Sequence, residues 1–288
     1  MTSNLYYLFD PIQFPEFGFN FLKNKNFFYR FQENKKFFFR TIYIPFGPVC
    51  NNKEGFNEFL EHLKTLKFTK IIIDLPMIYH KGIEEEIVSK LLKSGFKKKN
   101  YIYQDEETII IQRENFRLNS KKFYKVKQGL KNFNVIVKKE LNNEELEKIY
   151  QIYLFSAQRI GFLPKKIDVF KKLLENALVS LAMDKNTQNI EGYVFGYCFQ
   201  SYQNIQGDNI ANFLMVMFTG LTDKGRENNL GHSLHYQLFK EAFENYQIDF
   251  IDFHGASRTK NRTYTEFKKE WGGNFYSLAG SFEKINLF

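Results

Sequence analysis

IDFHG at residues 251–255 and FKKEWGG at residues 267–273 are the stretches from which the architecture is best inferred. The first is typical of a buried strand that ends at a glycine, and the second of a short helical turn followed by a glycine pair. The segment between them is basic and contains Arg258, Lys260 and Arg262. Ligands of open α/β sheets usually bind beyond the carboxyl ends of strands. These cations are therefore predicted to line a ligand site; a solvated loop is the alternative interpretation.

The composition indicates a globular chain. It has 288 residues, of which 43% are hydrophobic, enough for one large domain or two of ordinary size. Mean hydropathy is −0.42, and no apolar run approaches the roughly 20 residues that cross a bilayer. Residues 1–10 lack the pattern of a secretion signal, so we expect mature sequence there. Cys50 and Cys198 have no CxxC spacing, which predicts neither a disulfide framework nor a zinc site and fits the cytoplasm.

The charge balance favours a polyanionic partner. The formal net charge is +9 and the sequence pI is about 9.2, which suits RNA, anionic lipid or a nucleotide-linked substrate. The alternative is genome bias, because Lys, Asn, Phe and Ile have AT-rich codons and the chain contains 34 phenylalanines.

A helix–strand pattern occurs twice, at an offset of about 178 residues. Residues 56–66 have apolar residues at helical spacing and lead into an apolar strand at 68–76. Residues 234–243 are again amphipathic and lead into a strand expected over 246–253. The repeat predicts two domains of the same α/β design, with coincidental patterning as the alternative.

Each copy is followed by a glycine and then by a late strand pattern, at residues 108–112 and 282–288. A polar stretch near residues 113–120 predicts domains over 1–116 and 117–288, with the last strand able to pack on the first domain.

The second half has the element order of an N-acetyltransferase-like domain. A helix over 121–132 precedes a strand over 135–137, two helices, three strands, another helix and two late strands. We therefore predict an α/β (α+β) fold of two N-acetyltransferase-like (GNAT) domains, with mixed sheets flanked by helices. The two helices are expected over 142–158 and 166–177, and the three strands over 178–183, 191–198 and 211–219.

Three motifs resemble those of the FemA/FemB/FemX family. YIPFGPV at 43–49 resembles the family's Y-I-P-x-G-P-V signature, and residues 138–162 resemble its helix pair with R-x-G-F. Residues 252–255 and 267–273 resemble its D-x-x-G and F-K-x-x-F-G-G ending. The resemblance runs from about residue 41 to the end. Family members are tRNA-dependent aminoacyltransferases of peptidoglycan cross-bridge formation, with twin acetyltransferase-like domains.

The resemblance implies that an amino acid moves from aminoacyl-tRNA to the peptide-stem amine of a peptidoglycan precursor, with no cofactor. Lys268 would lie at the reacting ester and stabilise the oxyanion, and Phe267 would wall the pocket; a surface lysine is the alternative. The implied partners are aminoacyl-tRNA and a UDP-linked or lipid-linked muropeptide. We further expect a cytoplasmic monomer whose basic face touches the inner membrane surface or tRNA.

Further candidates for substrate binding are single residues, each with a plainer alternative. Arg159 is predicted to bind a carboxylate or phosphate of the substrate; the alternative is that it only interacts with the dipole at the end of its helix. His254 beside Gly255 suits a general base, or else hydrogen-bonds a loop. Tyr197 either lines the substrate or packs in the core, and Lys166 is implied by the resemblance. His232 and His235 are spaced i,i+3, but further ligands are missing from the sequence nearby, so no metal site is predicted.

Two other functions remain open. Acyl-CoA N-acyltransferases hold pyrophosphate at a helix start with R/Q-x-x-G-x-G/A; in residues 228–233 only Gly231 fits strictly. The second open function is that of a non-catalytic binding module on the same scaffold. The sequence leaves open which amino acid is transferred, whether the acceptor carries a lipid, whether CoA replaces tRNA, and whether the protein is active.

Overall fold

The computed structural model describes residues 20–45, 47–50, 53–75, 81–99, 107–202, 210–253, 255–256 and 262–286. The chain divides into two compact units. The first comprises Met1–Thr108, Gln200–Ala211 and Tyr276–Phe288, and the second Ile109–Phe199 and Asn212–Phe275.

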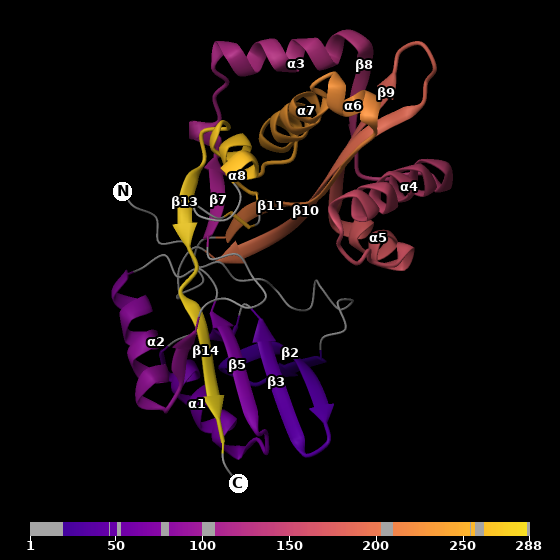
Figure 1. Ribbon diagram of the computed structural model, residues 1–288. Helices are drawn as coiled ribbons and strands as arrows, with labels where there is room; N and C mark the ends of the chain where they lie inside the picture. Colours follow the sequence, from indigo (N-terminus) through magenta and orange to yellow (C-terminus); the bar gives the residue numbers. More distant parts are fainter. Residues whose placement is uncertain are drawn as a thin grey trace. The chain divides into compact units, whose positions relative to one another are not determined.

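The first sheet has the order β1-β2-β3-β5-β14-β6, with β4 paired to β2. Strands β3 and β5 run parallel, and α1 makes the crossover between them (Figure 1). The sequence of β5, KIIIDL, is an apolar run without alternation, as expected for a strand that is covered on both faces. Ile73 at its centre is fully buried. The elements are β1 (Asn20–Lys23), β2 (Phe27–Lys36), β3 (Phe39–Pro45), β4 (Val49–Cys50), α1 (Lys53–Thr65), β5 (Lys70–Leu75), α2 (Lys81–Lys93), β6 (Lys97–Lys99) and β14 (Gly280–Ile285).

The second sheet has the order β13-β7-β12-β11-β10-β9-β8. Strands β11 and β12 are parallel, and α6 and α7 lie between them in the chain. The strands are β7 (Glu107–Gln112), β8 (Phe133–Lys138), β9 (Ala177–Asp184), β10 (Ile190–Tyr202), β11 (Ile210–Leu221), β12 (Phe250–Asp252) and β13 (Asn274–Ser277). The α-helices are α3 (Ser120–Asn132), α4 (Asn143–Ile160), α5 (Ile167–Leu173), α6 (Asp223–Glu227), α7 (Leu230–Asn245) and α8 (Arg262–Lys269), and 3-10 turns span Arg113–Asn115 and Leu174–Asn176.

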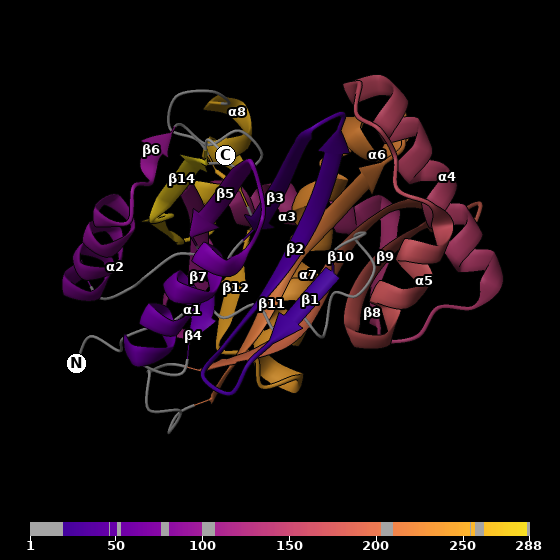
Figure 2. The same ribbon diagram turned by 90° about the horizontal axis from the view of Figure 1, so that it is seen from below.

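Helices cover both faces of the second sheet (Figures 1 and 2). Alternate residues of β10 show the division. Val194 belongs to the core cluster that contains α7, whereas Phe195 packs edge-on against Phe170 beside α4 and α5. Asn142 caps α4 with a full capping box, as the sequence predicts for a helix start there.

The two late strands lie in sheets formed by the opposite half of the sequence. β7 pairs antiparallel with β12 in the second sheet. β14 pairs antiparallel with both β5 and β6 in the first sheet. The chain of the second half thus returns to complete the first sheet, and the first unit is built from segments distant in sequence.

The predicted α/β class with two mixed sheets flanked by helices is confirmed. The strand expected over 246–253 is shorter than predicted, because only Phe250–Asp252 joins the ladder. Tyr246 closes α7, Gln247 adopts a positive φ of 52°, and the Ile248 amide donates back to the carbonyl of Ala242. These residues form the turn from helix to strand.

Candidate functional site

The end of β12 is a buried strand terminus with a glycine turn. The amide of Phe253 donates to the Ile109 carbonyl at 2.9 Å, continuing the pairing with β7. Gly255 then adopts a φ of +71°, a conformation that favours glycine. Asp252 and Ala256 are each 2% exposed. The backbone therefore leaves the sheet in a defined conformation at the position that the sequence predicts for a site.

Lys268 of α8 reaches this strand end. Its side chain is fully buried, and its Nζ donates to the Phe253 carbonyl at 3.0 Å and to the Gly255 carbonyl. A buried ammonium is stable only when its hydrogen bonds are made. Lys268 therefore ties α8 to the turn after β12 and places a positive charge inside the protein at that edge.

Phe267 packs toward α7. Its ring lies edge-on to those of His232 and His235, each at 5.1 Å between centroids, and to Trp271 at 6.0 Å. Because Phe267 belongs to this partly buried aromatic cluster, it holds α8 against α7 and thereby fixes the start of the Lys268 side chain.

A polar cluster beside α8 was missed by sequence reasoning. The Nζ of Lys122 is 3.7 Å from an oxygen of Glu270 and 4.3 Å from the Trp271 ring centroid. The Nε2 of His232 is 3.8 Å from the same carboxylate oxygen. Burial lowers the pKa of Lys122 to about 8, and burial followed by the charge of Lys125 lowers the pKa of His232 to about 4. The only sequence signal is the position of Lys122 on the apolar face of its helix.

His235 is held neutral. Its side chain is almost fully buried, and its Nδ1–H donates to the Gly231 carbonyl at 2.7 Å. Burial is the main reason that the pKa of His235 falls from 6.5 to about 4. In the part of the chain that is described, no group of three or more His, Cys, Asp and Glu residues is placed to hold a metal ion.

We expect the second unit to lose stability in acid. Because folding lowers the pKa of His235, its contribution is complete above pH 6.5 and is lost as the pH falls toward 4. The loss should be on the order of 2–3 kcal/mol. Urea unfolding between pH 7 and pH 4.5 measures it, and His235→Phe should reduce the acid loss by this amount and leave the part that comes from His232. A variant profile parallel to that of the wild type would show that other groups dominate.

Three of the remaining candidates, His254, Arg258 and Lys260, lie outside the described residues. Arg262 is the first residue of α8, but its side chain is also outside the described part. Tyr197 is 1% exposed in the core, on the same side of β10 as Phe195 and therefore facing away from α7.

Arg159 and Lys166 are both exposed and flank the turn between α4 and α5. Gly161 ends α4 in the left-handed conformation, with a φ of 84°. The hydroxyl of Tyr153 accepts from the Lys165 amide at 3.0 Å, which fixes the approach to α5. The R-x-G-F motif thus has a structural role as a helix terminator, with Arg159 inside the motif and Lys166 beyond it both on the surface.

The YIPFGPV motif surrounds the end of β5 in the first unit. Tyr43 donates to the Asp74 carboxylate at 2.6 Å, and the Gly47 amide donates to the Asp74 carbonyl at 3.2 Å. Asp74 is fully buried, and burial raises the pKa of its carboxyl. This motif therefore fixes the strand end that corresponds, in the repeat, to that of β12.

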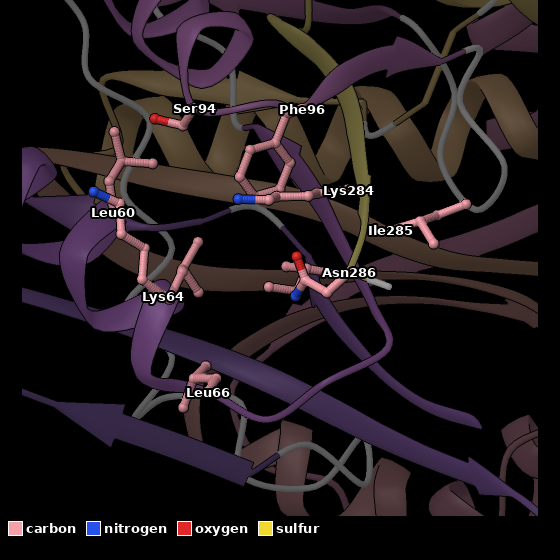
Figure 3. Close-up of a pocket in the computed structure, with 10 residues that line it drawn as sticks. Leu60, Lys64, Leu66, Ser94, Phe96, Lys284, Ile285 and Asn286 are labelled. Carbon is pink, nitrogen blue, oxygen red and sulfur yellow. The ribbon is translucent and has the colours of Figure 1, made fainter. Parts of the chain in front are cut away.

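A pocket of about 400 Å³ lies in the first unit. It opens near the start of β5, opposite the carboxyl ends of the parallel strands where ligands usually bind. Figure 3 shows Lys284 reaching across Phe96, at 5.8 Å from the ring centroid. The lining combines apolar side chains with two lysines and includes none of the predicted site residues; it consists of Leu60, Leu63, Lys64, Leu66, Ile71, Ser94, Phe96, Lys284, Ile285 and Asn286.

No family model matches the chain. No curated protein matches it in sequence. Among the described residues, none of the helices combines the length and the apolar character that a bilayer span requires.

Solved structures, in contrast, share its fold. The crystal structure of FemX is similar over 93% of this chain and 88% of its own, with a TM-score of 0.69 and 16% identity. The C-terminal domain of a putative lysylphosphatidylglycerol synthetase from Agrobacterium fabrum gives a TM-score of 0.62 at 8% identity, over 93% and 83% of the two chains.

A tandem GNAT protein from the clavulanic acid biosynthesis pathway gives a TM-score of 0.52 at 9% identity, covering 90% of this chain and 79% of that one. At these identities the likeness concerns the fold. The predicted FemX-like scaffold of two GNAT-like halves is thereby confirmed.

Proposed function

We propose that the protein is an acyltransferase that moves an amino acid from aminoacyl-tRNA to the peptide-stem amine of a peptidoglycan precursor. The observation that carries the proposal is the buried ammonium of Lys268, hydrogen-bonded at the end of β12 within a FemX-like fold. The name of the second neighbour, a lysylphosphatidylglycerol synthetase, describes a lysyl group joined to a lipid. That name fits a scaffold suited to aminoacyl transfer.

The reaction is the attack of an amine on an ester. A C–N bond forms, the C–O bond to the terminal ribose breaks, and the proton of the amine ends on the ribose hydroxyl. The enzyme must align the amine and stabilise the oxyanion. Lys268 contributes by fixing the carbonyls of Phe253 and Gly255 and by adding a positive charge where little water screens it. It acts as a positioning residue.

The other candidates take binding roles in this proposal. Arg258, Lys260 and Arg262 would contact phosphates of the tRNA end or of the precursor, which positions the donor without reading its sequence. His254 follows the strand and would accept the proton. The exposed pair Arg159 and Lys166 would bind acceptor carboxylate or phosphate groups from the α4–α5 turn. Tyr197 contributes packing.

The acyl-CoA alternative meets an obstacle at the start of α7. In that alternative, pyrophosphate would bind the free amides of this helix start. Here α3 packs over it: Asn229 donates to Gln128 at 2.9 Å, and Ser233 donates to the Val126 carbonyl at 2.9 Å. These contacts weigh against the binding of acyl-CoA pyrophosphate at this helix start.

The test is a transfer assay with labelled aminoacyl-tRNA pools and UDP-linked or lipid-linked muropeptides. We expect label to move to at least one acceptor, while acetyl-CoA transfers nothing and causes no thermal shift. Transfer from acetyl-CoA alone would establish the alternative donor. Tight binding of the muropeptide without transfer from either donor would indicate a binding module.

A further inference from the structure

A tight hairpin joins β2 and β3 (Figure 1), and its tip is aromatic and exposed. Phe37, Phe38 and Phe39 are 82%, 96% and 66% exposed. β2 is buried at its start, but from Gln32 to Lys36 every residue is exposed, so both faces of the strand are in water there. Consecutive exposed aromatic residues on a protein surface usually mark an interaction site.

The turn keeps phenylalanine where turn chemistry favours a smaller residue. Phe37 adopts a positive φ of 55° in the two-residue loop closed by the Lys36 and Phe39 pair. Glycine is preferred at such a position, and a bulky side chain there is strained. Phe37 therefore occupies a backbone conformation that local preference disfavours for an aromatic residue.

Positive charge surrounds the tip. Lys35 lies directly opposite Arg40 across the hairpin, an arrangement that weakens a strand pair unless an anion compensates. Glu33 offsets Arg40 in part, at 3.5 Å between the charged groups. Arg40 also lies 4.8 Å from the Phe68 ring centroid, and its amide donates to Thr69 at 3.2 Å. The base of the hairpin is thus fixed to the first sheet while the tip stays in water.

We infer that this hairpin tip inserts into the interface of an anionic lipid bilayer. Phenylalanine side chains enter the boundary between headgroups and acyl chains, and flanking lysines and arginine pair with anionic headgroups. The surface assigned is the loop Phe37–Phe38 with Phe39, Lys35, Lys36 and Arg40. This inference concerns binding alone and does not depend on the aminoacyl-transfer reaction.

Vesicle flotation tests the inference without tRNA or muropeptide. We expect the full chain to bind phosphatidylcholine vesicles that contain about 30% phosphatidylglycerol, and binding to fall roughly fivefold for each basic residue neutralised. Phe37→Asn combined with Phe38→Ser should lower binding about tenfold or more. Asparagine tolerates a positive φ, so this variant should keep its melting temperature. The matched control Leu92→Ser with Phe123→Ser, which removes two other exposed apolar side chains, should bind as the wild type does.

Tryptophan fluorescence locates the tip directly. The single tryptophan, Trp271, is fully buried, so brominated lipids should not quench the wild-type protein. Phe38→Trp should give a blue shift and quenching on anionic vesicles. Absence of vesicle binding, equal binding by the double variant, or an unquenched signal from the Phe38→Trp protein would each overturn the inference. A blue shift that depends on protein concentration without lipid would instead indicate self-association, and would also overturn it.

Discussion

Replacing Lys268 with methionine is expected to lower the rate of aminoacyl transfer by about a hundredfold, the scale of a displacement of about 1 Å between the reacting groups. Methionine keeps much of the side-chain volume but removes the charge and the hydrogen bonds to the Phe253 and Gly255 carbonyls. The loss should be mainly in kcat, because the turn positions the reacting ester. Steady-state kinetics with charged tRNA measure the split between kcat and KM.

Stability must be followed in the same variant. The carbonyls of Phe253 and Gly255 lose a buried donor, at about 1–3 kcal/mol for each group left unpaired. Transfer is therefore compared per folded molecule, with urea unfolding as the check. Lys269→Met is the matched control: Lys269 is the neighbour of Lys268, is exposed and pairs with Glu266 at 2.7 Å, so transfer should be unchanged. Folded Lys268→Met protein with the wild-type rate would remove Lys268 from the mechanism.

Replacing Gly272 with alanine is expected to destabilise the protein by about 2–4 kcal/mol, through a strained φ and a close backbone contact together. Gly272 has a φ of +80°, and an added Cβ would lie 2.5 Å from the carbonyl oxygen of Asn115. Backbone atoms cannot move aside as a flexible side chain can. Urea or thermal unfolding measures the loss.

Comparison with Gly161→Ala separates the cost of the strained φ from the cost of the close backbone contact. Gly161 has a nearly equal φ of +84°, but nothing lies within 4 Å of the position that an added Cβ would take. Only the conformational cost remains, about 1 kcal/mol. Equal losses in the two variants would show that the approach of Asn115 is unimportant. A larger loss at Gly272 would explain the glycine in the F-K…G-G ending by packing rather than by chemistry.

Helices and strands with a clear periodicity of apolar residues could be predicted from the sequence. The apolar spacing of 56–66 and 234–243 corresponds to α1 and α7, and the apolar run before Pro76 to β5. Local patterns do not encode which sheet a strand joins. The pairing of β7 with β12 and of β14 with β5 is set by long-range contacts between buried faces. A residue in a left-handed turn, such as Gln247, likewise shortens a strand without a clear signal in the sequence.

The sequence predicted that a helix carrying Lys268 follows the strand that ends at Gly255, but it did not predict the contacts between them. Sequence reasoning selected Lys268, yet its burial against two carbonyls depends on how α8 packs on the turn after β12. The sequence left Tyr197 open to packing or to lining the substrate, and the structure buries its side chain in the core. Lys122 escaped notice because its partners Glu270 and Trp271 come from a distant part of the chain.

Hydrogen–deuterium exchange with a non-hydrolysable mimic of the aminoacyl-tRNA end tests the central claim most directly. The claim is that the aminoacyl ester binds where β12 ends and Lys268 is anchored. We predict that the mimic slows amide exchange in peptides covering β12 and α8. In peptides that line the pocket of the first unit, such as those with Lys64 and Asn286, exchange should be the same with and without the mimic. Protection confined to that pocket, or none anywhere at saturating mimic, would contradict the account.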